Sequence, residues 1–271
     1  MTGAIPGPAL LFCPADRPDR YAKALAAADA VVLDLEDAVA PGAKAAARRV
    51  LVEHVVDPER VIVRVNGAAT ADQAADLDAL RRTPYRRVML PKAERVQDVE
   101  ALSAWSVVAL CETARGVLAA PSLAAAEPVV ALMWGAEDLV VSLGGRSSRR
   151  AGGEYHDVAR HARSSVLLAA GGCGRAAIDA VFLDTTDDDA LRREASEAAA
   201  VGFALKACIH PRQVPLVREA FAPDAGRVAW ARRVLEAAAQ GGVTLVDGQM
   251  VDGPLVRQAE RTLAVARPTS P

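Results

Sequence analysis

The sequence predicts an α/β fold, and within that class a (β/α)8 TIM barrel with a C-terminal helical extension. Eight short runs rich in Val, Leu and Ile recur along the chain, and Ala-rich segments with scattered charges separate them. The length of 271 residues suits such a barrel, which takes about 250 residues. Strand and helix in strict alternation are typical of a parallel sheet with helices outside it. A doubly wound open sheet is the competing architecture.

The apolar residues of the eight runs follow one another without strict alternation with polar residues. Continuous apolar runs of this length are typical of strands that are buried on both faces. We therefore expect strands at Ala9–Cys13, Ala30–Leu35, Val61–Val65, Arg87–Leu90, Val107–Cys111, Val129–Trp134, Ala180–Leu183 and Leu205–Ile209.

The segments between these runs carry helix signals. Thr70 is a candidate N-cap, because its hydroxyl can accept a hydrogen bond from the first turn. The pair Gly171-Gly172 is a stop signal. We expect helices at Arg20–Ala28, Ala43–His54, Ala71–Arg82, Val96–Leu102, Val117–Ala125, Asp157–Ala170 and Asp188–Ala200.

The chain continues after the eighth run for longer than one closing helix requires. We assign residues 1–222 to the barrel and residues 223–271 to a C-terminal extension. The expected elements are helices at Gln213–Phe221, Val228–Gln240 and Pro254–Ala266, with a strand or turn at Val243–Met250.

Composition excludes several classes of protein. The net charge is −2 without a long run of one sign, so the sequence lacks the polybasic surface that nucleic acids and anionic membranes attract. No apolar stretch approaches the roughly 20 residues of a membrane span, and the N-terminus lacks the pattern of a secretory signal. The four cysteines form no C-x-x-C pair, and three lie in apolar runs. We expect buried free thiols and a cytoplasmic location.

Charged residues follow several of the expected strands. Because the strands of a parallel barrel all end at one face, where such barrels carry their reactive groups, these side chains should converge. Buried charges must pair with one another or bind an ion or ligand. The residues are Asp34, Glu36, Asp37, Arg64, Lys92, Glu112, Glu137 and Asp138.

Glu112 and Asp138 follow neighbouring strands. Two carboxylates with open positions beside them suit Mg²⁺, which prefers oxygen ligands and retains waters. The sequence offers no His/Cys cluster for zinc, no nucleotide-binding glycine motif and no hydrolase elbow. The competing structural interpretations are an ion pair of Glu112 with Arg115, a helix N-cap at Asp138, and an ion pair of Arg64 at the barrel mouth.

Seven segments resemble, in order, the citrate lyase beta-subunit-like proteins of the HpcH/HpaI aldolase/citrate lyase family. The compact chain is similar to the stand-alone branch of that family. A departure is Ala15-Asp16, where many relatives have a Gly-Ser pair. The segments are Leu11–Pro18, Val32–Asp37, Val63–Asn66, Met89–Lys92, Glu112–Gly116, Trp134–Leu139 and Asp247–Pro254.

The resemblance implies a Mg²⁺-dependent site. Glu112 and Asp138 would be the metal ligands, and Glu36 with Asp37 would support the waters of the metal. Arg64 would hold the carboxylate of an oxo acid, such as oxaloacetate, pyruvate or glyoxylate. The implied reaction cleaves or forms a β-hydroxyacyl-CoA of the citramalyl-CoA, malyl-CoA or hydroxymethylglutaryl-CoA type.

The resemblance also implies contacts to the thioester and to a second subunit. Phe12, Arg17 and Lys23 lie where relatives bind coenzyme A. Backbone N–H groups of Ala136, Glu137 and Asp138 could stabilise the enolate of the leaving thioester. Asp252 would be the acid/base that reaches the mouth of a neighbouring subunit, which implies a homotrimer or a dimer of trimers.

Two rival functions stay open. A class II aldolase would act on free hydroxy-oxo acids without coenzyme A, but such enzymes usually carry a His base near the first strands. No His occurs between Cys13 and Asp37. Alternatively, the chain could be a citrate lyase beta-type subunit that requires an acyl-carrier partner, or a metabolite-binding protein.

Overall fold

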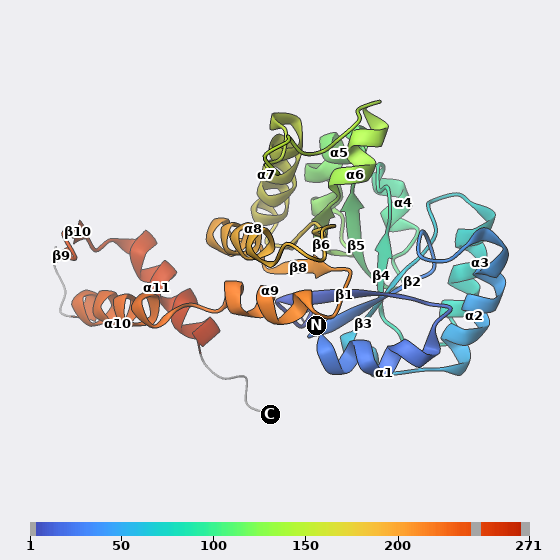
Figure 1. The fold of residues 1–271 in the computed structure, drawn as a ribbon, viewed down its shortest axis with the longest axis horizontal. Helices are drawn as coiled ribbons and strands as arrows, with labels where there is room; N and C mark the ends of the chain where they lie inside the picture. The colour runs from blue at the N-terminus through green and yellow to red at the C-terminus, as the bar shows by residue number, and fades with distance from the viewer. Residues whose placement is uncertain (1–3, 240–244, 267–271) are drawn as a thin grey trace. The chain divides into compact units, whose positions relative to one another are not determined.

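Eight parallel strands close into a barrel in the first part of the chain, with β1 hydrogen-bonded to both β2 and β8 (Figure 1). The computed structural model describes residues 4–239 and 245–266. These residues form two units that divide after Val217, and each unit is described by itself. The closed barrel confirms the predicted fold class.

The strands of the barrel are short and almost entirely buried. Alternate residues point inward, and Leu10, Val32, Ile62, Leu110 and Met133 form part of the apolar interior. The strands are β1 (Ala9–Pro14), β2 (Ala30–Asp34), β3 (Val61–Arg64), β4 (Arg87–Leu90), β5 (Ser106–Cys111), β6 (Val129–Trp134), β7 (Ala176–Asp179) and β8 (Leu205–Cys208).

Helices cover the outside of the barrel (Figure 1). Several begin at side-chain caps: Thr70 accepts from the Gln73 N–H at 3.1 Å, and Thr113 accepts from the Gly116 N–H at 3.0 Å, as good N-caps do. The helices are α1 (Pro18–Ala27), α2 (Lys44–Glu53), α3 (Ala71–Leu80), α4 (Val96–Glu100), α5 (Ala114–Ala125), α6 (Ala136–Ser142), α7 (Asp157–Gly172), α8 (Asp188–Val201) and α9 (Gln213–Phe221).

The seventh strand differs from its prediction. We expected Ala180–Leu183, but β7 is Ala176–Asp179, and its register with β8 pairs Asp179 with Lys206. The more apolar run 180–183 therefore lies beyond the strand. The prediction is wrong because Asp179 is fully buried inside the strand, where Lys206 and Arg163 neutralise it; a hydrophobicity pattern excludes such a residue.

A second difference concerns α6, which the sequence analysis did not predict. Its seven residues follow β6 after the single residue Gly135. The segment was interpreted only as the polar end of a strand, because it is too short for a helical pattern to repeat. The other helices lie at their predicted positions, with ends displaced by a few residues, as helix ends commonly are.

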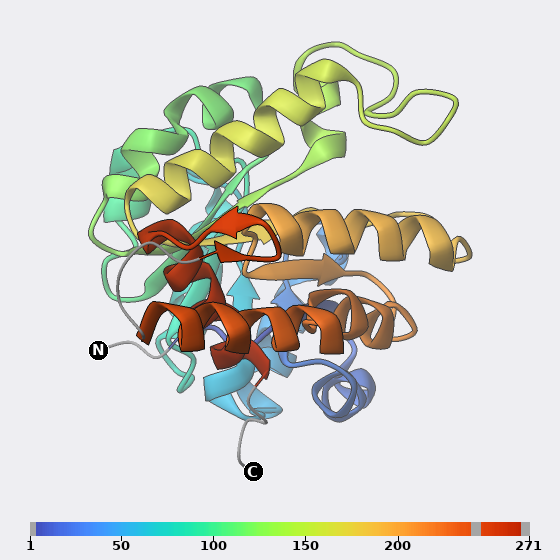
Figure 2. The same cartoon turned by 90° about the vertical axis from the view of Figure 1, so that its left-hand side faces the viewer.

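The C-terminal unit contains α10 (Ala225–Ala239), the hairpin strands β9 (Leu245–Val246) and β10 (Gln249–Met250), and α11 (Gly253–Ala266). The two helices pack against each other around Ala231, Val234 and Ala259 (Figure 2). Gln240 and residues 243–244, which we assigned to a helix and a strand, lie outside the described residues. The functional division at residue 222 stays a prediction.

Two further findings concern composition. Within the described ranges, no helix has the length and apolar character needed to cross a membrane. All four cysteines are free thiols; Cys13, Cys111 and Cys208 are buried, and Cys173 is exposed.

Candidate active site

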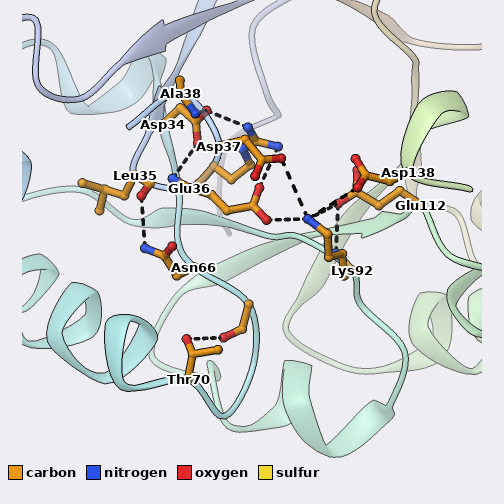
Figure 3. Close-up of polar contacts among 12 residues, drawn as sticks. Asp34, Leu35, Glu36, Asp37, Ala38, Asn66, Thr70, Lys92, Glu112 and Asp138 are labelled. Carbon is orange, nitrogen blue, oxygen red and sulfur yellow. Dashed lines mark hydrogen bonds and ion pairs between the residues drawn. The ribbon is translucent and has the colours of Figure 1, made fainter. Parts of the chain in front are cut away.

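The charged residues that follow the strands converge at the C-terminal rim of the barrel (Figure 3). Asp34 ends β2, Arg64 ends β3, and Glu112 directly follows β5. Because all these strands are parallel, their last residues reach the same face of the barrel. We call the set the rim cluster; it consists of Asp34, Glu36, Asp37, Arg64, Lys92, Glu112 and Asp138.

Asp34 and Arg64 form a buried bidentate pair. Arg64 donates from Nε to Asp34 Oδ1 at 2.7 Å and from Nη2 to Asp34 Oδ2 at 2.6 Å. The same carboxylate accepts from the N–H groups of Glu36 at 2.9 Å and Ala38 at 3.0 Å. Four hydrogen bonds thus fix the turn after β2 and the plane of the guanidinium. The structure therefore contains the ion pair of Arg64 at the barrel mouth that was one of the competing structural interpretations.

Glu36 lies between the two cations of the rim cluster. Its Oε1 accepts from Lys92 Nζ at 2.6 Å, and its Oε2 is 3.0 Å from Arg64 Nη1. The second contact is an ion pair without hydrogen-bond geometry, so the buried Oε2 atom has no hydrogen-bond partner. Burial raises the pKa of Glu36 despite the two cations. Among the described residues, the ion pair with Arg64 compensates this oxygen and no hydrogen bond does.

Lys92 places its ammonium among four carboxylates. Besides Glu36, Nζ lies 3.7 Å from Asp138 Oδ1, 3.9 Å from Glu112 Oε1 and 3.9 Å from Asp37 Oδ2. Burial opposes the charge, but Glu36 and the other acids outweigh it and raise the pKa of Lys92. Its backbone has φ of +48°, a conformation that is uncommon for residues other than glycine and is found at functional sites.

Glu112 is the most buried of the carboxylates near Lys92. Its Oε1 accepts from the Lys92 N–H at 3.1 Å. Burial, reinforced by the nearby Asp138 charge, raises the pKa of Glu112 to about 8. A Cβ on Gly135 would lie 2.9 Å from Glu112 Oε2, so the absence of a side chain there makes room for this carboxylate.

The charges of the rim cluster fit a divalent cation. Five carboxylates face two cations, which leaves three negative charges in excess. Among the described residues, no group of three or more acids, histidines or cysteines could enclose a metal ion. Glu112 and Asp138 both face Lys92, and carboxylate oxygens are the donors that Mg²⁺ prefers.

The other predicted residues of the barrel lie around this cluster. The Arg64 guanidinium carbon is 5.1 Å from the Phe12 ring centroid. Arg17 directly precedes α1 and pairs with Asp19 at 3.0 Å, and Lys23 is exposed on the same helix. Within the described part of the chain, neither Arg17 nor Lys23 forms a hydrogen bond or ion pair with the rim cluster.

Ala136, Glu137 and Asp138 form the first turn of α6 but point in different directions. Ala136 is buried, and Asp138 faces Lys92. Glu137 instead accepts from the Ser148 hydroxyl at 2.6 Å and lines a polar cavity of about 750 Å³ beside α7 and α8. The structure thus separates Glu137 from the Lys92 side of the rim cluster.

Asp252 belongs to the C-terminal unit. Its Oδ1 accepts from the Leu255 N–H at 3.1 Å, and its side chain is exposed before α11. This contact makes it the cap of that helix. Its role as an acid/base stays a prediction.

Sequence analysis did not assign a site role to two members of the rim cluster. Asp34 was one of three adjacent acids, and only its direction at the end of β2 distinguishes it from Glu36 and Asp37. Lys92 was noted only as a possible pairing partner. Its position after Pro91, at the end of a strand, was the available signal.

A parallel barrel with a rim cluster of this kind defines a class of enzyme that acts on small oxygen-rich substrates with a divalent metal. The chain belongs to the HpcH/HpaI aldolase/citrate lyase family, whose model matches residues 9–211. It is 57% identical over 258 residues to a citrate lyase subunit beta-like protein of Mycobacterium tuberculosis, with 95% of this chain and 94% of the relative covered.

Two further comparisons agree with this assignment. The L-malyl-CoA/beta-methylmalyl-CoA lyase of Rhodobacter capsulatus is 33% identical, with 92% of this chain and 91% of the lyase covered. The crystal structure of CitE from Mycobacterium tuberculosis in complex with magnesium, acetoacetate and coenzyme A superposes with a TM-score of 0.93. It is 56% identical and covers 96% of this chain and 98% of its own.

Proposed function

We propose that this chain is a magnesium-dependent carbon–carbon lyase that cleaves, or forms, a β-hydroxyacyl-CoA thioester. The substrate class contains citramalyl-CoA, malyl-CoA and hydroxymethylglutaryl-CoA, and the products are an acyl-CoA and an oxo acid such as oxaloacetate, pyruvate or glyoxylate. The observation that carries the proposal is the convergence of Glu112, Asp138 and Arg64 on one rim of the barrel. The lyase and the magnesium complex among its relatives support the reaction class.

In this proposal Glu112 and Asp138 hold Mg²⁺, and Glu36 with Asp37 accept hydrogen bonds from its waters. When bound, the metal supplies Lewis acidity that lowers the pKa of the substrate hydroxyl and stabilises the developing oxo acid. Lys92 lies among the same acids and keeps their mutual repulsion low before the metal binds.

Arg64 orients the oxo-acid carboxylate. The hydrogen bonds from Nε and Nη2 to Asp34 occupy one edge of the guanidinium. Nη1, which forms an ion pair with Glu36 without hydrogen-bond geometry, would turn its N–H groups to the substrate carboxylate. Burial opposes the positive charge, but Asp34 and the other acids raise the pKa of Arg64, so the group stays charged throughout the reaction. Its planar, fixed donors suit a carboxylate better than those of a lysine.

The residue roles that we propose at the thioester rest on the resemblance to the family. Phe12, Arg17 and Lys23 contact coenzyme A, and the N–H groups of residues 136–138 stabilise the enolate. Asp252 protonates the enolate carbon of the acyl-CoA in the cleavage direction and removes that proton in the condensation direction.

We further infer a homotrimer or a dimer of trimers, in which residues 223–271 of one copy bring Asp252 to the mouth of its neighbour. The exposed position of Asp252 supports this arrangement. The free thiols support a cytoplasmic location.

The test is a cleavage assay on the purified chain with citramalyl-CoA, malyl-CoA and hydroxymethylglutaryl-CoA, with and without Mg²⁺. Glu112→Gln should abolish Mg²⁺-dependent turnover, while the exposed Glu100→Gln should retain it. Asp252→Asn should lose turnover but bind Mg²⁺ normally, and mixing it with Glu112→Gln should restore activity if the site is shared between subunits. Cleavage of free hydroxy-oxo acids alone, or turnover only with an acyl-carrier partner, would refute the proposal.

A further inference from the structure

A buried lysine supports the rim cluster from beneath. Lys44 is the first residue of α2 and is 9% exposed. Its Nζ donates to the carbonyl oxygens of Leu35 and Glu36, each at 3.2 Å, and to the side-chain oxygen of Asn66. Within the described part of the chain, no carboxylate forms an ion pair with this ammonium. A buried charge with neutral partners is costly, so its position calls for a physical reason.

The network continues from Lys44 into the helix layer. Asn66 donates from Nδ2 to the Leu35 carbonyl at 3.1 Å and to Asp76 Oδ2 at 2.7 Å (Figure 3 shows the first contact). Asp76 is fully buried and accepts from Arg48 Nε at 2.6 Å. Lys44 is therefore connected through one amide group to the Arg48–Asp76 ion pair. This network of hydrogen bonds joins α2 and α3 to the ends of β2 and β3.

The network fixes the turn that carries Glu36. The Glu36 carbonyl accepts from Lys44 and from the Val39 N–H at 3.2 Å, while the Glu36 N–H donates to Asp34. The backbone carbonyl of Glu36 is thus fixed by Lys44, and its backbone N–H is fixed by Asp34. The Glu36 side chain can then reach only the mouth, where it contacts Arg64 and Lys92.

We propose that Lys44 is a positioning residue for the reaction at the rim. By clamping the Leu35 and Glu36 carbonyls, its ammonium sets the direction of the Glu36 carboxylate, and through Glu36 the positions of Arg64 and Lys92. The proposal rests on the proposed lyase function of the rim cluster. It assigns no contact between Lys44 and the substrate.

Lys44→Met tests the proposal, because it removes the ammonium and retains an unbranched side chain. We expect kcat to fall and the Mg²⁺ dissociation constant to rise, each by about 10- to 100-fold, as for the loss of groups that orient metal ligands. The KM for the acyl-CoA should stay unchanged. Calorimetric titration with Mg²⁺ alone measures the second effect without turnover.

Arg60→Met is the matched control. Arg60 also clamps backbone carbonyls, those of Leu25 at 2.6 Å, Asp29 at 2.9 Å and Ala28. It precedes β3, so it lies at the opposite end of the barrel from the rim. A comparable loss of thermal stability without a change in kcat or Mg²⁺ affinity is expected for this variant.

The outcomes separate the inference from the proposed function. Wild-type kcat and Mg²⁺ affinity in folded Lys44→Met, with lower stability alone, would overturn the positioning role. If that variant does not fold, Lys44→Gln retains an amide donor and should show the same losses to a smaller extent; unchanged values in it would equally overturn the role. Wild-type protein without lyase activity would refute the function, while the Mg²⁺ titrations would still decide the role of Lys44.

Discussion

Gly135→Ala probes the rim cluster through a single methyl group. Gly135 lies between β6 and α6 with φ of −129° and ψ of 130°, an extended conformation that alanine adopts without strain. The added Cβ would lie 2.8 Å from Glu112 Cβ and 2.9 Å from Glu112 Oε2. Any change in kcat or Mg²⁺ affinity caused by the substitution is therefore expected to arise from contact with Glu112.

The distances give the size of the effect. Carbon atoms in favourable contact are at least about 3.5 Å apart, so the Glu112 side chain must move by about 0.7 Å. Overpacking of this kind costs about 1–3 kcal/mol of stability, offset by about 0.4–1 kcal/mol from the lower entropy of the unfolded chain. Misplacement of a reacting group by about 1 Å can reduce the rate by about 100-fold. We therefore expect about a 10- to 100-fold loss of kcat and of Mg²⁺ affinity, with a net loss of stability of roughly 0–2.6 kcal/mol.

The assay is calorimetric titration with Mg²⁺ together with steady-state cleavage of the best acyl-CoA. Gly67→Ala is the control, because Gly67 also follows a strand at this face and an added Cβ there meets no atom within 4 Å. In the Glu112→Gln background, Gly135→Ala should cause no further loss of Mg²⁺ affinity or kcat, since the two changes act on one group. Unchanged Mg²⁺ affinity in Gly135→Ala would refute the assignment of Glu112 as a metal ligand.

Two further predictions concern groups outside the rim. Lys206 outweighs the effect of burial and holds the pKa of Asp179 below its usual 3.8, while Asp179 raises the pKa of Lys206 above its usual 10.5. The stability from this pair is present above pH 3.8 and below pH 10.5, and is lost outside that window; thermal melts should show losses there that Lys206→Met does not share. Burial raises the pKa of Cys13 to about 11 and that of Cys111 to about 12. At pH 8 a thiol reagent should modify Cys173 in the native protein, and rapid reaction of either buried thiol would contradict the packing.

Much of the fold could be predicted because the apolar composition of the runs indicates that the strands are buried. Segments such as Ala30–Asp34 are apolar on both faces, so their place inside a parallel barrel follows from the pattern. The pattern failed at β7, where Asp179 is fully buried and pairs with the equally buried Lys206 of β8. Only the three-dimensional pairing of two charges makes such a strand stable, and periodicity does not record it.

The rim could be predicted as a location but not as a set of contacts. Parallel strands bring Arg64 and Glu112 to one face, and this follows from the topology alone. Which acid pairs with which cation depends on differences of about 1 Å in the positions of the side chains. Lys44 shows the limit most clearly, because its partners are backbone carbonyls and an amide, and a carbonyl has no signature in a sequence.

The electrostatics of the rim give an independent reason for choosing Glu112 and Asp138 as the metal ligands. Asp34 is neutralised by two hydrogen bonds from Arg64, and Glu36 by close contacts to both cations. Among the described contacts of Glu112 and Asp138, the cation is Lys92, at 3.9 Å and 3.7 Å, beyond hydrogen-bond distance. Asp37 is also 3.9 Å from Lys92, but its side chain is 62% exposed and water compensates its charge. Glu112 and Asp138 are therefore the less exposed acids whose charge is least compensated, and burial, reinforced by Asp138, raises the pKa of Glu112. A divalent cation stabilises the rim most where that charge remains.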